Sequence, residues 1–129
     1  SEYTLVHKTS ETILHLAEMG SVVIIGRGAN AITRHLPYGF HVRLVGSLER
    51  RVKYTQEHYQ LTREQALQQV QKEDQGRRDY MKRYFSKNVE DPLLYDLIVN
   101  TDSVSLAEAT RTIGEAVLRI RDKIRVAEG

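Results

Sequence analysis

A short aliphatic run followed by an arginine between two glycines constrains the fold of this chain most. Val22-Val-Ile-Ile25 contains only β-branched residues, and Gly26, Arg27 and Gly28 follow it directly. Such a run is typical of a strand that is buried on both faces in a parallel sheet. The two glycines let the backbone approach a ligand closely, and the arginine adds a guanidinium, so this turn suits a phosphate group. The spacing fits a plain tight turn with a solvated arginine equally well.

The periodicity of the remaining chain predicts an α/β protein. Helices are expected at 9–19, 29–36, 47–59, from 62 onward and from 105 onward, and strands at 22–25, 41–45 and 93–99. Thr62 with Gln65 and Ser105 with Glu108 have the capping-box spacing that starts a helix. Strands separated by helices pair in parallel through right-handed crossovers. We therefore expect one helix-rich domain over residues 1–129, with a short parallel sheet of about three strands.

Composition excludes several classes of function. The chain has 19 Lys and Arg against 17 Asp and Glu, a net charge of +2 that does not by itself indicate a nucleic-acid partner. The absence of cysteine excludes thiolate catalysis and zinc–thiolate sites, and the five histidines have no metal-ligand spacing, so no metal site is expected. The aliphatic run at 22–25 is far shorter than the roughly 20 residues that cross a bilayer. A cytoplasmic protein without a membrane partner is the expectation.

Two features fit phosphate chemistry, and each has an alternative. In parallel sheets ligands bind at the carboxyl ends of the strands, here residues 26–30, 46–47 and 100–102. The first stretch also reads Gly-x-Gly-x-x-Ala, and Glu49 follows the next predicted strand, as in a dinucleotide-binding domain. Three strands are too few for a complete domain of that kind, so this reading stays a second alternative.

The second feature is the basic stretch 72–83, where Asp74 and Arg77 lie three residues apart and share a helix face. A movable basic helix supplies the charges that phosphoryl transfer requires. A solvated, salt-bridged helix face is the alternative. Tyr80, Tyr84 and Phe85 interleave the cations, as in single-strand nucleic-acid binders, but their helical spacing favours a packing role.

Together these stretches resemble the cytidylate-kinase-like family of P-loop phosphotransferases. The resemblance covers about residues 21–113 and is most specific in Asp74-Gln-Gly-Arg77 and in Tyr95-Asp-Leu-Ile-Val-Asn-Thr101. It implies a nucleoside-monophosphate-kinase-like fold whose lid spans about residues 62–88. It also implies transfer of a phosphoryl group from ATP to a nucleotide-like acceptor.

The resemblance implies substrate-binding roles for Gly26, Arg27, Gly28 and Arg51. Arg27 would hold the phosphate of the acceptor nucleotide, and Arg51 would be a further phosphate contact. The cytidylate kinases carry an acidic residue after this arginine, and Gly28 stands there in this chain, a departure that bears on cytidine specificity.

Catalytic and nucleotide-binding roles follow from the same resemblance. Asp74 and Arg77 would belong to the lid, with Arg77 reaching the transferred phosphoryl group. Asn100 and Thr101 would end the last strand beside the nucleotide base.

The sequence departs from the family in one large respect. No glycine is followed by lysine, so the Gly-x-x-x-x-Gly-Lys-[Ser/Thr] loop that holds ATP is missing. ATP and Mg²⁺ are implied for an intact family member, and this chain alone is expected to bind no cofactor and to be inactive. In the family the strand before that loop lies at the sheet centre. We therefore expect either closure of 22–25 onto 41–45 or a homodimer that fills the gap.

Three functions follow. The first is a portion of a cytidylate-kinase-like phosphotransferase without its ATP-binding loop, that is, a fragment or a truncated form. The second is a non-catalytic regulatory module that binds a nucleotide or small anion through Arg27, Arg51 and Arg77. The third is the dinucleotide-binding domain.

Overall fold

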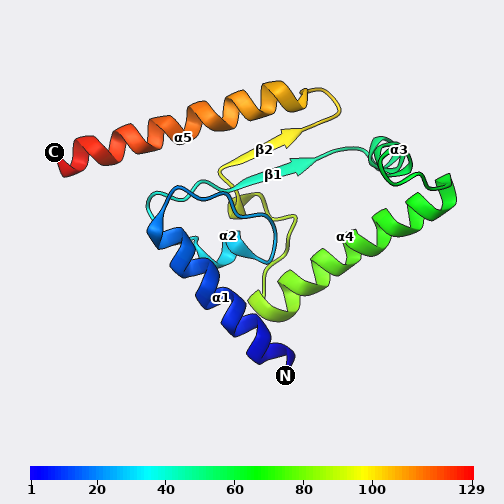
Figure 1. Ribbon diagram of the computed structural model, residues 1–129, viewed down its shortest axis with the longest axis horizontal. Helices are drawn as coiled ribbons and strands as arrows, with labels where there is room; N and C mark the ends of the chain where they lie inside the picture. The colour runs from blue at the N-terminus through cyan, green and yellow to red at the C-terminus, as the bar shows by residue number, and fades with distance from the viewer.

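The computed structural model describes all residues, 1–129, and contains five α-helices, one short 3₁₀ helix and two strands (Figure 1). The elements in chain order are α1 (Glu2–Met19), α2 (Ala29–Ile32), β1 (Val42–Val45), α3 (Leu48–Tyr59), α4 (Arg63–Phe85), the 3₁₀ helix η1 (Pro92–Leu94), β2 (Leu97–Asn100) and α5 (Leu106–Glu128). The helix-rich α/β class expected from the sequence is confirmed. No helix is both long and apolar enough to span a membrane.

The helix ends predicted from local sequence form as expected. The Ser47 side chain accepts a hydrogen bond from the backbone N–H of Arg50 at the start of α3, and both capping boxes close at the starts of α4 and α5. Gly20 ends α1 with a φ of 79°, a conformation that glycine adopts without strain. The helix expected at 29–36 is shorter and ends at Ile32.

The sheet contains two parallel strands, with Val42 opposite Leu97 and Val45 opposite Asn100. The strand expected at 93–99 begins later. Asp91 caps a 3₁₀ turn over 92–94 by accepting a hydrogen bond from the Leu93 N–H at 2.9 Å, and the strand starts at Leu97.

The predicted strand at 22–25 is wrong. These residues have no regular structure, and the side chains of Val23 and Ile25 are 88% and 90% exposed rather than buried. A β-strand requires hydrogen bonds to a neighbouring strand, and β1 pairs only with β2. The expected closure of 22–25 onto β1 is therefore not formed, and both strands keep one unpaired edge.

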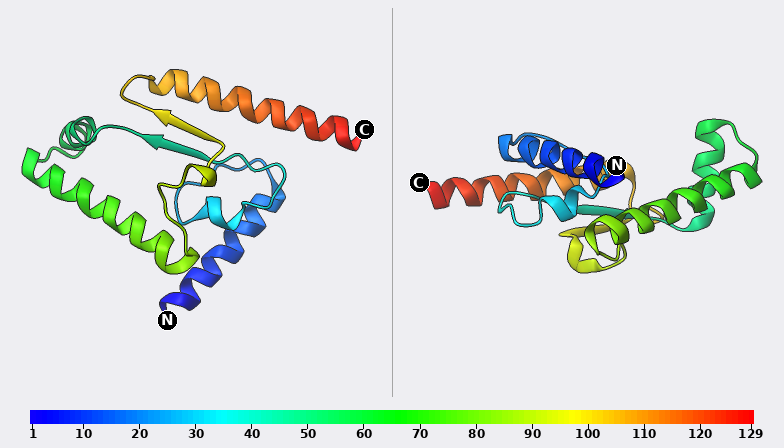
Figure 2. Two further views of the ribbon diagram at one scale, coloured as in Figure 1. Left: turned by 180° about the vertical axis from the view of Figure 1, so that it is seen from behind. Right: turned by 90° about the horizontal axis from the view of Figure 1, so that it is seen from below.

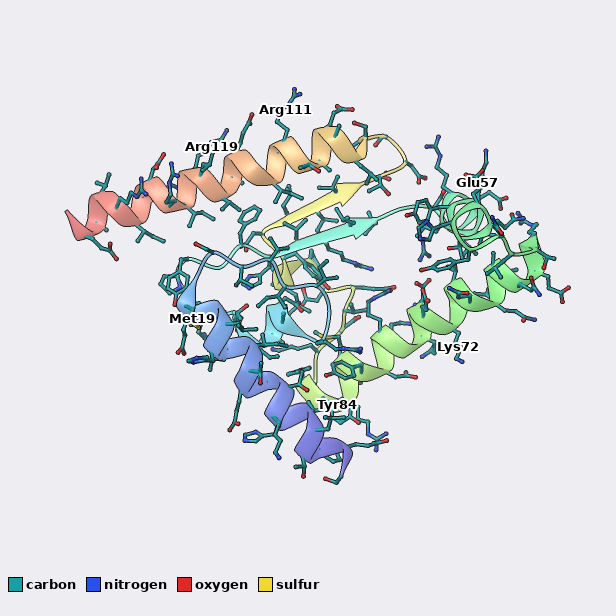
Figure 3. The ribbon with its side chains drawn as sticks, in the orientation of Figure 1. Met19, Glu57, Lys72, Tyr84, Arg111 and Arg119 are labelled. Atoms are coloured by element: carbon teal, nitrogen blue, oxygen red, sulfur yellow. The ribbon has the colours of Figure 1, made fainter.

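The chain buries little of its surface. Its accessible area is 9724 Å², whereas a compact monomer of this mass exposes about 7,000 Å². The main hydrophobic cluster lies between α3 and α4 and consists of Val52, Ala66 and Val70. Figure 2 shows why the rest is open: α5 extends to one end of the molecule while the α3–α4 hairpin extends to the other. Arg111 and Arg119 project from α5 away from the strands (Figure 3).

Candidate functional site

Asp74 joins two arginines that come from different helices. It lies in the middle of α4, and both of its carboxylate oxygens accept hydrogen bonds from Arg51 of α3, at 2.8 and 2.9 Å. The Arg51 Nε also donates to the carbonyl oxygen of Gly46 at 3.1 Å, so the whole guanidinium is fixed. This two-point geometry is the strong form of an arginine–carboxylate pair.

Arg77 contacts the same carboxylate more loosely. Its Nη1 donates to Asp74 Oδ1 at 3.3 Å, and its side chain is 59% exposed, against 19% for Asp74. The hydrogen bonds from Arg51 lower the pKa of Asp74, burial opposes them, and Arg77 lowers the pKa further. The carboxylate is thus ionised at neutral pH and orients two guanidiniums. The predicted sharing of a face by Asp74 and Arg77 is confirmed as geometry, while their catalytic roles stay a prediction.

Sequence reasoning missed Arg43 and Tyr95 as members of this region. The Arg43 guanidinium, on β1, lies 5.8 Å from the centre of the Tyr95 ring and forms no ion pair. Burial raises the pKa of Tyr95, whereas the guanidiniums of Arg43 and Arg77 lower it, so both lie near the phenol. The signal in the sequence was a single cation on an apolar strand, without an acid opposite it.

The residues after the strands serve mainly to hold the loops. The Thr101 hydroxyl donates to the carbonyl oxygen of Val45 at 2.9 Å, and the Asn100 side chain accepts from the Asp102 N–H at 3.0 Å. Asp102 in turn accepts from the Ser47 N–H at 3.0 Å, and this contact lowers its pKa. The structure therefore places Asn100 and Thr101 at the carboxyl edge, as expected, with their side-chain oxygens engaged by the backbone.

The Gly26–Arg27–Gly28 turn has a left-handed backbone, and its second glycine is tightly packed. Its three residues have φ values of 75°, 58° and 71°, all in the left-handed region. A Cβ atom at Gly28 would overlap the ring of Phe85, so this glycine permits close packing against the end of α4. No hydrogen bond or ion pair joins Arg27 to the Asp74 cluster. The amide nitrogen of Asn30 is buried without a hydrogen-bond partner, which leaves one unused donor beside the turn.

Glu49, the acidic residue that the dinucleotide-binding alternative depends on, forms an ion pair with Arg63. Both of its oxygens accept hydrogen bonds from Arg63, which lower its pKa. The carboxylate holds the start of α4 against α3 on the exposed side of the hairpin.

The short parallel sheet and the long helices form an α/β domain, and comparison with family models identifies it as kinase-like. The model of the cytidylate kinase-like family matches residues 1–103, so the chain belongs to that family. A solved structure of an uncharacterized protein from Eubacterium ventriosum ATCC 27560 has the same fold, with a TM-score of 0.73 and 23% sequence identity. The similarity covers 89% of this chain and 62% of that protein. No significant match is found among curated proteins.

Proposed function

We propose that Arg51, Asp74 and Arg77 belong to the acceptor-phosphate site and the lid of a phosphotransferase that acts on a nucleotide-like acceptor. The observation that carries the proposal is the Arg51–Asp74–Arg77 cluster, in which one ionised carboxylate orients two guanidiniums. Membership of the kinase-like family supports the same conclusion.

The two arginines are suited to different tasks. Arg51 is fixed by Asp74 and by the carbonyl of Gly46, so it would provide a rigid positive charge for the acceptor phosphate. Arg77 has only one hydrogen bond to Asp74, and a guanidinium has five N–H donors. The free donors of Arg77 would turn to the transferred phosphoryl oxygens as negative charge spreads over them.

Further N–H donors lie on β1 and in the Gly26–Gly28 turn. Arg43 brings a half-buried guanidinium without a carboxylate partner, an arrangement that favours a bound anion over an empty site. The exposed Arg27 would contact the acceptor from the Gly26–Gly28 turn. ATP and its Mg²⁺ would be held by a glycine-rich loop that these 129 residues do not contain.

Calorimetric titration with cytidine monophosphate, inorganic phosphate and ATP tests the proposal. We expect weak binding of the first two that falls as salt rises, and negligible binding of ATP. Arg77→Ala should weaken monophosphate binding about tenfold or more. Arg119→Ala is the matched control, because Arg119 is an exposed arginine on α5 with only a 3.9 Å ion pair to Glu115. Equal affinities of the two variants would contradict the site, and micromolar ATP binding would contradict the assignment of the missing loop.

A further inference from the structure

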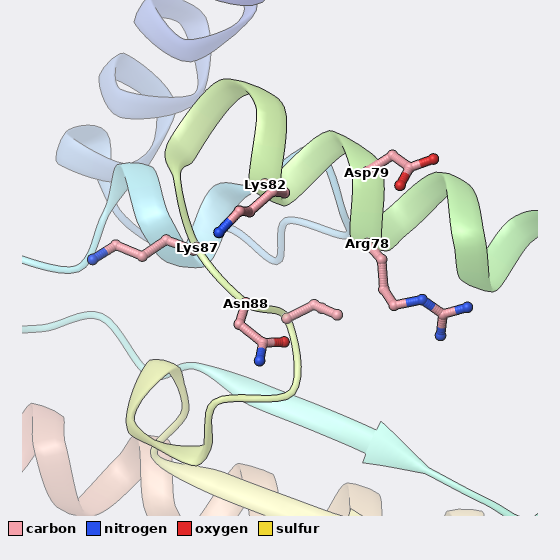
Figure 4. A pocket seen from close by; sticks show the side chains of 6 residues that line it. Arg78, Asp79, Lys82, Lys87 and Asn88 are labelled. Atoms are coloured by element: carbon pink, nitrogen blue, oxygen red, sulfur yellow. The ribbon is translucent and has the colours of Figure 1, made fainter.

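A second group of cations surrounds a hollow at the carboxyl-terminal end of α4. The hollow has a volume of about 260 Å³ and is lined by Arg78, Asp79, Lys82, Lys87, Asn88 and Val89. Figure 4 shows Lys82 between Arg78 and Lys87, directed toward the loop that carries Asn88, while Asp79 points away. We call this the α4 hollow.

The charges of the α4 hollow are not balanced within the chain. Arg78, Lys82 and Lys87 form no ion pair with any carboxylate. The one acid in the wall, Asp79, accepts a hydrogen bond from the neutral Gln75 amide at 2.7 Å. The Asn88 side-chain oxygen accepts from the Glu90 N–H at 3.0 Å, which leaves its NH₂ group as a free donor. The wall of the hollow thus contains three cations and an amide donor against one carboxylate.

The negative end of a helix attracts cations, but that effect explains only part of this group. It acts within the last turn of a helix, where Lys82 lies. Arg78 lies farther back along α4, and Lys87 lies beyond the end of the helix. The helix end therefore does not account for Arg78 and Lys87, and a bound anion would give all three lining cations a partner.

The turn that follows α4 holds the hollow in place. Ser86 has a φ of 54°, in the left-handed region, and the Lys87 N–H donates to the carbonyl oxygen of Met81 at 3.2 Å. This reversal returns Lys87 alongside the last turn of α4. Val89 is 7% exposed and anchors the loop, and its carbonyl oxygen accepts the Tyr95 hydroxyl at 2.7 Å. The site is thus shaped before any ligand arrives.

We propose that the α4 hollow binds a small phosphoanhydride anion of the pyrophosphate type. Four of the six lining side chains, those of Arg78, Lys82, Lys87 and Asn88, carry N–H donors that suit phosphate oxygens, and the three cations suit an anion with more than one charged group. The volume lies just below the roughly 300–1,000 Å³ of sites for larger ligands, so the whole ligand is small or enters by its phosphate end. The hollow shares no lining residue with the Arg51–Asp74–Arg77 cluster, and the proposal does not rest on the proposed function.

The test is a titration of the isotope-labelled chain with pyrophosphate, followed through the backbone amides of residues 86–89 and by calorimetry. Lys82→Gln with Lys87→Gln should weaken binding at least about tenfold. Lys82 is exposed and Lys87 is half-buried, and neither forms an ion pair, so the double variant should remain folded. Lys53→Gln with Lys72→Gln is the matched control: it removes the same charge from exposed lysines outside the hollow, and affinity should change by less than about twofold.

A third variant separates this site from the acceptor site. Arg77→Ala should change the calorimetric affinity for pyrophosphate by less than about twofold, whatever it does to monophosphate binding. The proposal is overturned if pyrophosphate does not shift these amides, or if the two double variants lose affinity equally. It is also overturned if a single-stranded oligonucleotide binds through Lys82 and Lys87 while pyrophosphate does not, because the hollow would then serve a nucleic-acid backbone.

Discussion

Replacing Asp74 by asparagine removes one negative charge and changes almost no volume. Arg51 and Arg77 would then share a neutral amide at the interface between α3 and α4. Loss of one partner from a fully buried ion pair costs about 3–5 kcal/mol, but the Arg51 side chain is 38% exposed and solvent screens much of its charge. We therefore expect Asp74→Asn to lower the free energy of unfolding by about 1–2 kcal/mol at pH 7.

The pH dependence of this loss provides a second check. Hydrogen bonds from Arg51 lower the pKa of Asp74 in the folded chain. Its stabilising contribution is therefore complete above the unfolded pKa, near about 3.9, and disappears as pH falls through the lower folded pKa. The difference between the wild type and Asp74→Asn should be full at pH 7 and should shrink below about pH 4.

Urea unfolding followed by circular dichroism at pH 7 and at pH 3 measures both effects. Glu49→Gln is the matched control, because it removes a carboxylate from another two-point arginine pair between the same helices, but at an exposed position. This control should change stability little. If Asp74→Asn unfolds like the wild type at pH 7, or no differently from Glu49→Gln, the pair does not hold the hairpin and the reasoning is refuted.

Two other predictions concern packing. Gly28→Ala should lower the free energy of unfolding by about 2–4 kcal/mol, because the left-handed φ of Gly28 and the ring of Phe85 both oppose a side chain. Gly76→Ala, in the open middle of α4, should instead raise it by about 0.5–1 kcal/mol in the same urea unfolding assay. A stable Gly28→Ala variant would contradict the packed turn. Val23→Asp with Ile25→Asp should reduce self-association and dye binding in light-scattering and fluorescence measurements, because these residues expose apolar surface. Leu93→Asp, equally exposed but on the 3₁₀ turn, should not; an equal reduction would assign the association to general hydrophobicity.

Local patterns predicted the parts of the fold that depend on local interactions. The caps at Ser47, Thr62 and Ser105 require only a side chain and the backbone three residues later, and all three form. The strand at 22–25 depends on a partner elsewhere in the sheet. Its residues have the right composition, but no neighbouring strand donates to them, so a correct local pattern gave a wrong element.

In the candidate site, too, contacts within one helix could be predicted from the sequence and contacts between distant segments could not. Asp74 and Arg77 were paired in advance because helix geometry brings residues three apart together. The contact of Asp74 with Arg51 crosses 23 residues and depends on how α3 packs on α4, which no spacing in the sequence reports. Arg43 was missed for the same reason, since its neighbour Tyr95 comes from a distant segment.

The α3–α4 hairpin contains the main hydrophobic cluster, the exposed Glu49–Arg63 ion pair and the Arg51–Asp74 ion pair. Helices that are held together by their own contacts move together, so the α3–α4 hairpin would move as a rigid body. The hairpin joins the rest of the chain at two points, Gly46 before α3 and Ser86 after α4. Its rotation would carry Arg51 and Arg77 at a constant separation. The distance between the two charges would then be set by the fold, and only their approach to a ligand would vary.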